Sequence, residues 1–241
     1  DLLLKETGYN STKDQRLRVY LTNSLEEASG EIPNLFMAQW LTEEAIQADN
    51  IKRDTPVMCI IGNPPYAVSS TNKNEWIQNL IADYKRGLNE RKINLDDDYI
   101  KFIRFGQHFI DKNGSGILAY ISNNSFVDGI THRQMRKNLL ESFDKIYILD
   151  LHGNAKKKEV CPDGSADQNV FDIMQGVSIN IFIKTGKKKK SEFGKVFHSN
   201  LQGKREFKYE TLNANTIETF EWKSLDFTKP NYFFVPKNFD E

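Results

Sequence analysis

A short apolar segment that runs into two consecutive prolines constrains the fold of this chain more than any other feature. Residues 56–61 are too few for a helix and rich in strand formers, and Gly62-Asn63-Pro64-Pro65-Tyr66 follows directly. Proline cannot donate to a strand ladder, so the strand has to end there. In open α/β sheets, ligands bind at the carboxyl ends of the strands. The segment therefore predicts a buried strand with a binding site at its end.

Strands and helices alternate along most of the remaining chain, which predicts an α/β fold with a largely parallel sheet and helices on both faces. The predicted helices are the end of one over 1–8, then 41–53 with Thr42 as N-cap, 73–86, 98–111 and 131–142. The predicted strands are 18–21, 57–61, 117–121, 145–151 and 176–184. Residues 152–168 are polar and predict a loop.

The residue types of the turn after the first apolar strand suit one particular chemistry. An amino group conjugated to a ring or a carbonyl is a poor nucleophile, and two acceptors placed at its N–H bonds localise its lone pair. The Asn63 side-chain oxygen and the Pro64 carbonyl are candidates for these acceptors, and Pro65 stiffens the turn. Tyr66 offers a face on which a flat group can stack. The turn therefore predicts methylation of a planar amino group, although a rigid turn with a core tyrosine would also explain the four residues.

With these residues in place, the chain resembles the amino-methyltransferases, and within them the methyltransferase domain of single-chain Type ISP restriction-modification enzymes. The matching stretches follow the order of the family and cover most of residues 15–240. They are VYLTNSLEE (19–27), IIGNPPY (60–66), DDYIKFIRFGQHFI (97–110), GILAYISNNSFVD (116–128), FDKIYILDLHGNAKKKE (143–159) and NVFDIMQGVSINIFIK (169–184).

The resemblance implies a Rossmann-like methyltransferase sheet flanked by helices and the transfer of a methyl group from S-adenosylmethionine to adenine N6 in double-stranded DNA. It also implies a nuclease or translocase upstream and a target-recognition domain downstream in the same parent chain. An enzyme that acts on a base has to extrude it from the duplex into a pocket of aromatic faces. In the family, an aromatic residue at the position of Phe171 stacks on that base opposite Tyr66, although Phe171 could also be a core residue.

Two further positions are predicted cofactor contacts by the same resemblance, and each has an alternative interpretation. Asn23 lies where the family contacts the adenine of the cofactor, but it could equally be a turn residue or a helix cap. Phe102 matches an aromatic residue of the same pocket, yet it lies on a predicted helix with many apolar neighbours, which favours core packing. Lys156, Lys157 and Lys158 predict DNA phosphate contacts or a solvated loop with about equal weight.

Charge, cysteines and hydropathy narrow the class of protein without defining it. Lysine plus arginine and aspartate plus glutamate are both 33, so any DNA contact has to come from local patches. The two cysteines, Cys59 and Cys161, lack metal-ligand spacing, and no metal site is predicted. The sequence has neither a signal peptide nor an apolar run of membrane-spanning length, so no membrane association is predicted and a cytoplasmic location is expected.

A glycine-rich cofactor loop, which the resemblance implies upstream of the turn, is missing from this sequence. Only Gly8, Gly30 and Gly62 precede Asn63, and no G-x-G occurs among them. We therefore expect a fragment that is incomplete at its N-terminus and inactive alone. Residues 1–190 are predicted as the methyltransferase core, and 191–241 as the end of that core and the approach to a target-recognition domain.

Three functions remain open at this point. The first is the DNA adenine-N6 methyltransferase part of a restriction-modification enzyme. The second is a protein glutamine N5-methyltransferase, because a glutamine amide is also a planar NH2 and would use the same turn. The third is a DNA-binding fragment without catalytic activity, which the missing loop favours for this chain alone. An aromatic partner such as Phe171 and the residues beyond Lys184 favour the first.

Overall fold

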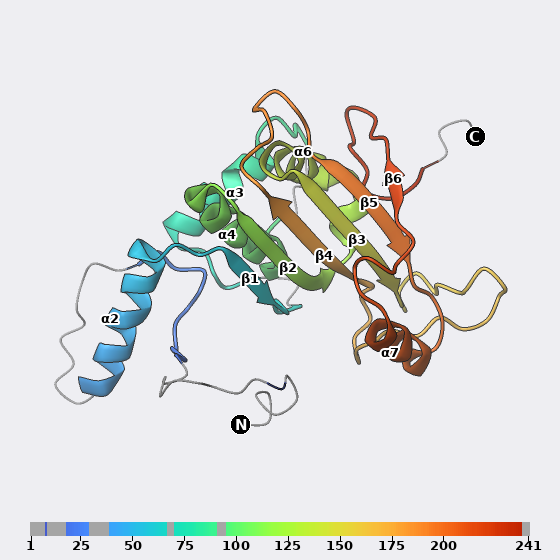
Figure 1. Ribbon diagram of the computed structural model, residues 1–241, viewed down its shortest axis with the longest axis horizontal. Coiled ribbons are helices and arrows are strands. Elements are labelled where there is room, and N and C mark those ends of the chain that lie inside the picture. The colour runs from blue at the N-terminus through green and yellow to red at the C-terminus, as the bar shows by residue number, and fades with distance from the viewer. Residues whose placement is uncertain (1–7, 9–17, 29–38, 67–69, 91–94, 238–241) are drawn as a thin grey trace. The chain divides into compact units, whose positions relative to one another are not determined.

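The computed structural model describes residue 8 and residues 18–28, 39–66, 70–90 and 95–237. Backbone contacts divide the chain into two compact units. The first comprises residues 1–23 and 28–55, and the second comprises residues 24–27 and 56–241. The two units are described separately below, and Figure 1 shows their elements. Among the described residues, no helix combines the length and the apolar character needed to cross a membrane.

The first unit contains one described helix, α2 (Gln39–Asp54). It confirms the predicted helix over 41–53, but it begins before Thr42, which therefore lies inside the helix and is not its N-cap. The predicted strand over 18–21 is wrong, because these residues pair with no strand and Leu21 is 78% exposed. A strand that buries neither face and has no partner gains nothing from its propensity. The predicted helix over 1–8 lies outside the described residues, apart from Gly8 in a turn.

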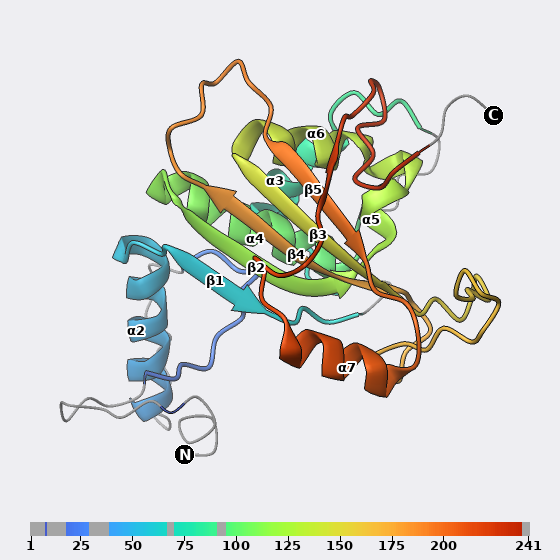
Figure 2. The ribbon, with the colours of Figure 1, turned by 45° about the vertical axis from the view of Figure 1, so that its right-hand side comes forward.

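The second unit is built on one six-stranded sheet with the order β1-β2-β4-β3-β5-β6 (Figures 1 and 2). The strands are β1 (Cys59–Gly62), β2 (Gly116–Asn123), β3 (Lys145–His152), β4 (Val177–Lys184), β5 (Lys195–Asn200) and β6 (Lys223–Leu225). The α/β class and the flanking helices are confirmed, but the predicted helices of this unit lie on one face of the sheet and not on both. The predicted strand over 57–61 begins two residues later than expected, at Cys59.

The expectation of a largely parallel sheet is wrong, because parallel and antiparallel strand pairs are mixed in it. Strands β1 and β2 pair in parallel, as do β3 and β5. Strand β4 is antiparallel to both of its neighbours, and β6 is antiparallel to β5. A parallel return would need a crossover, usually a helix, whereas the segment between β3 and β4 is a loop. Strand β4 can therefore run back between β2 and β3, and its first residue meets the last residues of both neighbours.

Helices gather on one face of this sheet, with α3, α4 and α6 packed together behind the strands in Figure 2. They are α3 (Glu75–Lys85), α4 (Asp98–Asn113), α5 (Ser125–Asp128), the 3-10 turn Ile130–His132 and α6 (Arg133–Ser142). The side chain of Asn74 caps α3 by accepting from the Ile77 N–H, and Gly114 ends α4 at a φ of +85°. These ends confirm the helices predicted over 73–86 and 98–111. The helix predicted over 131–142 consists of the 3-10 turn and α6.

The main core lies between these helices and the facing side of the sheet. It contains a fully buried guanidinium, that of Arg136, which donates to the carbonyls of Phe126, Gly129 and Asn231. A buried charge is tolerated only when its donors are paired, and these contacts tie α6 to α5 and to the C-terminal segment. The opposite side of the sheet is less covered, since Ile61 of β1 is 81% exposed.

Strand β5, strand β6 and the helix α7 (Arg205–Ala214) between them were not predicted. Strands β5 and β6 extend the same sheet, so residues 195–225 belong with the strands that precede them. Their sequences are short and interrupted by charged residues, which hides the periodicity on which prediction depends. The boundary near residue 190 and the approach to a recognition domain remain predictions.

Candidate active site

The turn that follows β1 lies at the carboxyl end of the sheet's edge strand. Pro64 is buried, whereas Asn63 and Pro65 are exposed and Tyr66 is half-buried. A Cβ on Gly62 would lie 3.2 Å from the Tyr120 ring, so the absence of a side chain lets the strand approach β2 closely. The strand ladder ends at Gly62, and an amide side chain, a proline carbonyl and an aromatic ring follow it in sequence. The predicted acceptor Asn63 is thus on the surface and accessible to a substrate.

Tyr66 meets Phe171, which is far away in the sequence. The two ring centroids are 5.9 Å apart and their planes are inclined by 58°. Both rings pack against a second apolar cluster formed by Leu149, Leu151 and Val177, together with Val170 and Leu201. The structure therefore brings together the two aromatic residues that the sequence predicted as partners. Aromatic contacts of this kind stabilise a fold by about 0.5–1.5 kcal/mol beyond the area that they bury.

The spacing of the Tyr66 and Phe171 rings determines whether a base fits between them. A base stacked between two parallel rings needs about 7 Å, twice the stacking distance of about 3.4 Å found in DNA. At 5.9 Å and a tilt of 58°, Tyr66 and Phe171 are in contact with each other and leave no such gap. A base could enter only after the rings separate by about 1 Å and become parallel.

The hydroxyl group of Tyr66 is buried and has no hydrogen-bond partner among the described residues. Desolvation raises the pKa of this phenol to about 12, so it stays neutral at physiological pH. A buried hydroxyl without a partner normally costs stability. The ring of Tyr66, and not its hydroxyl, is therefore the part with an evident use at this site.

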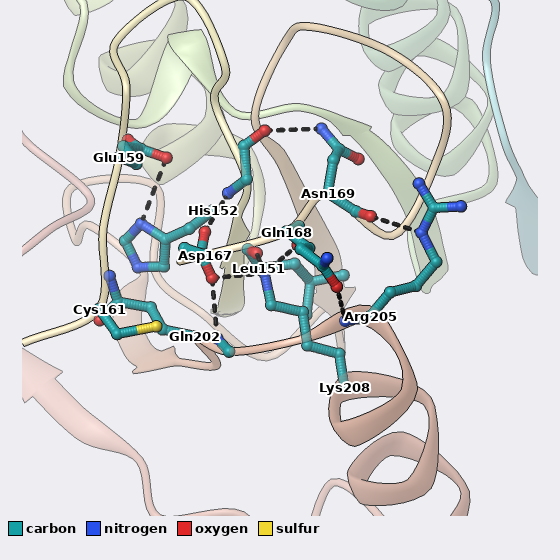
Figure 3. A network of polar contacts seen from close by, with 12 residues as sticks. Leu151, His152, Glu159, Cys161, Asp167, Gln168, Asn169, Gln202, Arg205 and Lys208 are labelled. Carbon is teal, nitrogen blue, oxygen red and sulfur yellow. Dashed lines mark hydrogen bonds and ion pairs between the residues drawn. The ribbon is translucent and has the colours of Figure 1, made fainter. Parts of the chain in front are cut away.

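Phe171 lies in a loop before β4. Several polar side chains hold this loop, and Figure 3 shows Asp167, Asn169 and Arg205 among them. Asn169 is central: its amide nitrogen donates to the carbonyls of Gly153 and Gln175, and its oxygen accepts from the Phe171 N–H. Gly153 has a φ of +75°, and a Cβ there would lie 2.5 Å from the Asn169 Cα. The close approach of the two ends of the loop between β3 and β4 therefore requires glycine at position 153.

The fully buried carboxylate of Asp167 joins the two ends of this loop to each other and to Gly203, which precedes α7. Asp167 accepts from the backbone N–H groups of Gly153 at 2.6 Å and Gly203 at 2.8 Å. It also pairs with the ammonium group of Lys208 at 2.8 Å, and both side chains are inaccessible to solvent. Because each charge has several partners, this pair can persist in the interior.

Three lysines occupy the loop between β3 and β4. Lys156, Lys157 and Lys158 are exposed in a turn, and they form no ion pair with any residue that the structure describes. Lys158 has a φ of +52°, which is uncommon for a residue with a side chain. Uncommitted lysines at the edge of a site are available for phosphate contacts, and a solvated turn would have the same geometry.

The two predicted cofactor contacts lie in different units of the chain. Asn23 belongs to the first unit, where it is exposed and its carbonyl accepts from Lys52. Phe102 belongs to the second unit, where its half-buried ring packs against the main core and against Phe105. The only G-x-G of the chain, at Gly114, leads from a helix into a strand, the reverse of a cofactor loop. The roles of Asn23 and Phe102 at a site for S-adenosylmethionine therefore remain predictions. The described residues contain no group of three or more side chains suited to a metal ion.

Several residues that shape this site were not identified from the sequence. Gly153, Asp167 and the side chains of α7 were not predicted, because their partners are remote in sequence. Asn169 was noticed only as a neighbour of Phe171. An isolated glycine between a strand and a lysine-rich loop was the one available signal, since such a glycine indicates close backbone approach.

Residues 4–156 match the family model described as Eco57I restriction-modification methylase. The match covers more than half of the chain, so the chain belongs to this family. The resemblance found from the sequence is thereby confirmed at the level of restriction-modification methylases. No curated protein sequence matches the chain.

Solved structures with a similar fold come from larger proteins. The DrdV–DNA complex has 27% sequence identity and a TM-score of 0.72, and the match covers 87% of this chain and 21% of that one. The ATP-dependent Type ISP restriction-modification enzyme LlaBIII, bound to DNA, has 26% identity and a TM-score of 0.73, over 92% of this chain and 15% of that one. A nuclease-deletion mutant of the Type ISP enzyme LlaGI has the same fold at 19% identity and a TM-score of 0.70, over 86% and 17%. This chain thus spans about a fifth or less of the length of these three proteins.

Proposed function

We propose that this chain is the part of a restriction-modification enzyme that presents adenine for N6 methylation in double-stranded DNA. The observation that carries the proposal is the meeting of Tyr66 with Phe171 beside the turn that contains Asn63 and Pro64. The rings provide stacking faces, and the turn provides oxygen acceptors for an amino group. Membership of the restriction-modification methylase family supports DNA as the substrate.

In this proposal the Asn63 side-chain oxygen and the Pro64 carbonyl accept hydrogen bonds from the two N–H bonds of the adenine amine. Localising the lone pair on nitrogen makes the amine nucleophilic without a strongly basic residue. Because these acceptors favour the charge that develops during transfer, they lower the barrier and do not merely bind the base. Pro65 keeps the turn rigid, since its ring fixes the backbone φ.

The flipped adenine enters between Tyr66 and Phe171 once the rings have separated. Extrusion of a base costs a few kcal/mol of lost pairing and stacking, and two aromatic faces offset this at about 1–3 kcal/mol for each base–ring stack. Lys156, Lys157 and Lys158 contact the DNA phosphates near the site. These lysines would contribute affinity and salt dependence without sequence preference.

S-adenosylmethionine is the proposed methyl donor. We assign no step to its binding groups and keep Asn23 and Phe102 as proposed contacts only. The proposal also includes a nuclease or translocase and a target-recognition domain in the same parent protein, and a cytoplasmic location where DNA and cofactor meet. The two DNA-bound neighbours with more than 25% identity are consistent with such a setting.

The test replaces Asn63 in the intact protein that carries this sequence. We expect Asn63→Ala to lower methyl transfer to DNA by at least about 100-fold, the usual loss when one preorganised hydrogen-bonding group is removed. DNA affinity should stay within about twofold, because DNA phosphate contacts dominate affinity. The measurements are the incorporation of labelled methyl groups into N6-methyladenine and a gel-shift titration.

Asn213→Ala is the matched control, because Asn213 is exposed on α7 and has no assigned role. It should leave both measurements unchanged. Near-normal turnover of Asn63→Ala would contradict the role of the turn. Label recovered in protein glutamine and absent from DNA would instead identify a glutamine methyltransferase.

A further inference from the structure

Four consecutive carbonyl groups in the Phe171 loop accept hydrogen bonds from side chains of one helix, α7. The donors and acceptors are Lys208 Nζ to Gln168 at 2.6 Å, Arg205 Nε to Asn169 at 2.8 Å, the Tyr209 hydroxyl to Val170, and Arg205 Nη2 to Phe171 at 3.1 Å. Residues 167–176 belong to no strand or helix, so their backbone groups need partners from elsewhere. Helix α7 supplies them over the whole run that ends at Phe171.

The donors share one face of α7. Arg205, Lys208, Tyr209 and Leu212 follow the spacing i, i+3, i+4 and i+7, which places their side chains on one side of a helix. Leu212 packs against the same apolar cluster as Tyr66 and Phe171. The polar and apolar contacts of this face therefore dock α7 along the loop and beside the aromatic pair.

Lys208 has no unused donor. Its ammonium group donates to the Leu151 and Gln168 carbonyls, both at 2.6 Å, and pairs with Asp167 at 2.8 Å. Three donors with three acceptors satisfy a lysine completely. The side chain is fully buried, so it is a structural support and cannot act on a substrate.

Arg205 differs from Lys208 because its planar guanidinium group reaches two successive points of the loop. Its Nε and Nη2 atoms contact the carbonyls of Asn169 and Phe171, and Nη2 also contacts Asp172 at 2.7 Å. The Asp172 side chain is 92% exposed, so that ion pair is weak. A fork of fixed geometry specifies the direction of both carbonyls, which a single ammonium group could not do.

Phe171 is therefore fixed at both of its backbone groups. Its N–H donates to the Asn169 side-chain oxygen at 2.9 Å, and its carbonyl accepts from Arg205. With both groups fixed, the position of the ring depends mainly on side-chain rotamers. The loop thus presents the ring in one place, although the loop itself has no regular secondary structure.

We propose that Arg205 is a positioning residue for base stacking: through the Asn169 and Phe171 carbonyls, it holds the Phe171 ring where the flipped adenine has to stack. This inference rests on the proposed function and assigns a role to a residue of α7 that contacts the Phe171 loop. Arg205 acts only through Phe171, so its effect on catalysis should disappear when that ring is absent.

The experiment is a double-mutant cycle in the intact protein, with Arg205→Lys, Phe171→Ala and the combined variant. Arg205→Lys keeps the positive charge and removes the fork. We expect it to lower kcat roughly 10- to 100-fold, as small displacements of positioned groups do, while KM for DNA stays within about twofold. The substrate is total DNA from cells that lack adenine methylation, and the readout is the initial rate of N6-methyladenine formation.

In the Phe171→Ala background, Arg205→Lys should change kcat by less than about twofold, because coupled residues are not additive. Equal losses in both backgrounds would mean a general structural role and would overturn the inference, as would an unchanged kcat in the single variant. Arg86→Lys is the matched control, since Arg86 is 82% exposed and also pairs with an aspartate, Asp83. It should leave kcat unchanged.

Hydrogen exchange separates this inference from the proposed function. Arg205→Lys should raise amide exchange in residues 168–172, and Arg86→Lys should not, whether or not DNA is the substrate. Unchanged exchange in Arg205→Lys would overturn the inference. A wild-type protein that transfers no methyl group to DNA would instead overturn the proposed function, and with it the stacking role of Phe171.

Discussion

The two halves of the candidate site, the turn 63–66 and the loop 167–176, are built in opposite ways. The turn is contiguous, follows its strand directly and owes its shape to two prolines. The loop has no regular structure and owes its shape to Asn169, Asp167 and the side chains of α7. A site half that depends on local residues can be recognised in a sequence. A half that depends on remote partners cannot.

The two halves also differ in how their polar groups are satisfied. In the turn, the Asn63 side chain is exposed and the Tyr66 hydroxyl lacks a described partner. In the loop, every carbonyl from Gln168 to Phe171 accepts from α7. Open groups are available to a substrate, whereas satisfied groups support the shape. This difference fits the proposed function, in which the turn performs the chemistry and the loop supplies a fixed wall.

The largest effect on this comparison should come from removing the buried ammonium group. Lys208→Met leaves the Asp167 carboxylate buried without its counter-charge and two carbonyls without donors. Breaking a buried pair in this way destabilises proteins by about 3–5 kcal/mol, and we expect a loss in that range. Equilibrium unfolding in urea measures it, and Lys204→Met, an exposed neighbour one turn away, should change stability by less than about 0.5 kcal/mol. Equal stability of the two variants would show that the loop does not depend on α7.

A smaller effect is expected from changes at Tyr66 in the turn, where two substitutions separate the role of the ring from that of the hydroxyl group. Tyr66→Ala removes a stacking face worth about 1–3 kcal/mol, so kcat/KM for methyl transfer should fall roughly 5- to 150-fold. Tyr66→Phe keeps the ring and removes a buried hydroxyl that has no described partner. It should retain activity within about twofold and raise the unfolding free energy by about 1 kcal/mol. Loss of activity in Tyr66→Phe would assign the hydroxyl group a role and would contradict the conclusion that only the ring of Tyr66 is used at this site.

The smallest effect concerns Asp97. Asp167 has several hydrogen-bond and ion-pair partners, whereas Asp97 has a buried oxygen without one among the described residues. Its Oδ1 is buried without a described partner, and burial, followed by the neighbouring charges of Asp96 and Asp98, raises its pKa to about 6. The folded state therefore binds this proton more tightly than the unfolded state does. The contribution of Asp97 to the free energy of unfolding is therefore highest below about pH 4, and it decreases as the pH rises to about 6.

Asp97→Asn should remove that dependence and stabilise the protein at pH 7 by up to about 1 kcal/mol, after allowance for solvent screening of a half-exposed group. Urea unfolding at pH 4, 5, 6 and 7 measures the slope. Asp226→Asn, which changes an exposed carboxylate of the same unit, should keep the wild-type slope. An identical slope in Asp97→Asn would show that Asp97 does not titrate in this range.

Prediction from the sequence succeeded where the signal was local and failed where pairing decided the outcome. The helices α3, α4 and α6 were predicted because their apolar spacing and, for α4, the glycine that ends the helix lie within single segments. The direction of β4 was missed, because strand propensity carries no information about the neighbour with which a strand pairs. The strand over 18–21 was wrong for a related reason, since extended residues without a partner form no sheet.

The sequence by itself determined the turn at Asn63-Pro64-Pro65-Tyr66, the residue types for an amino-group acceptor and the membership of a methylase family. These depend on residues that are adjacent in the chain. Only the tertiary structure decided that Tyr66 contacts Phe171, that the rings are closed on each other, and that α7 supports the loop through Arg205 and Lys208. Those contacts join residues 33 and more positions apart, and their energy depends on burial and on satisfied partners, neither of which can be read from one segment.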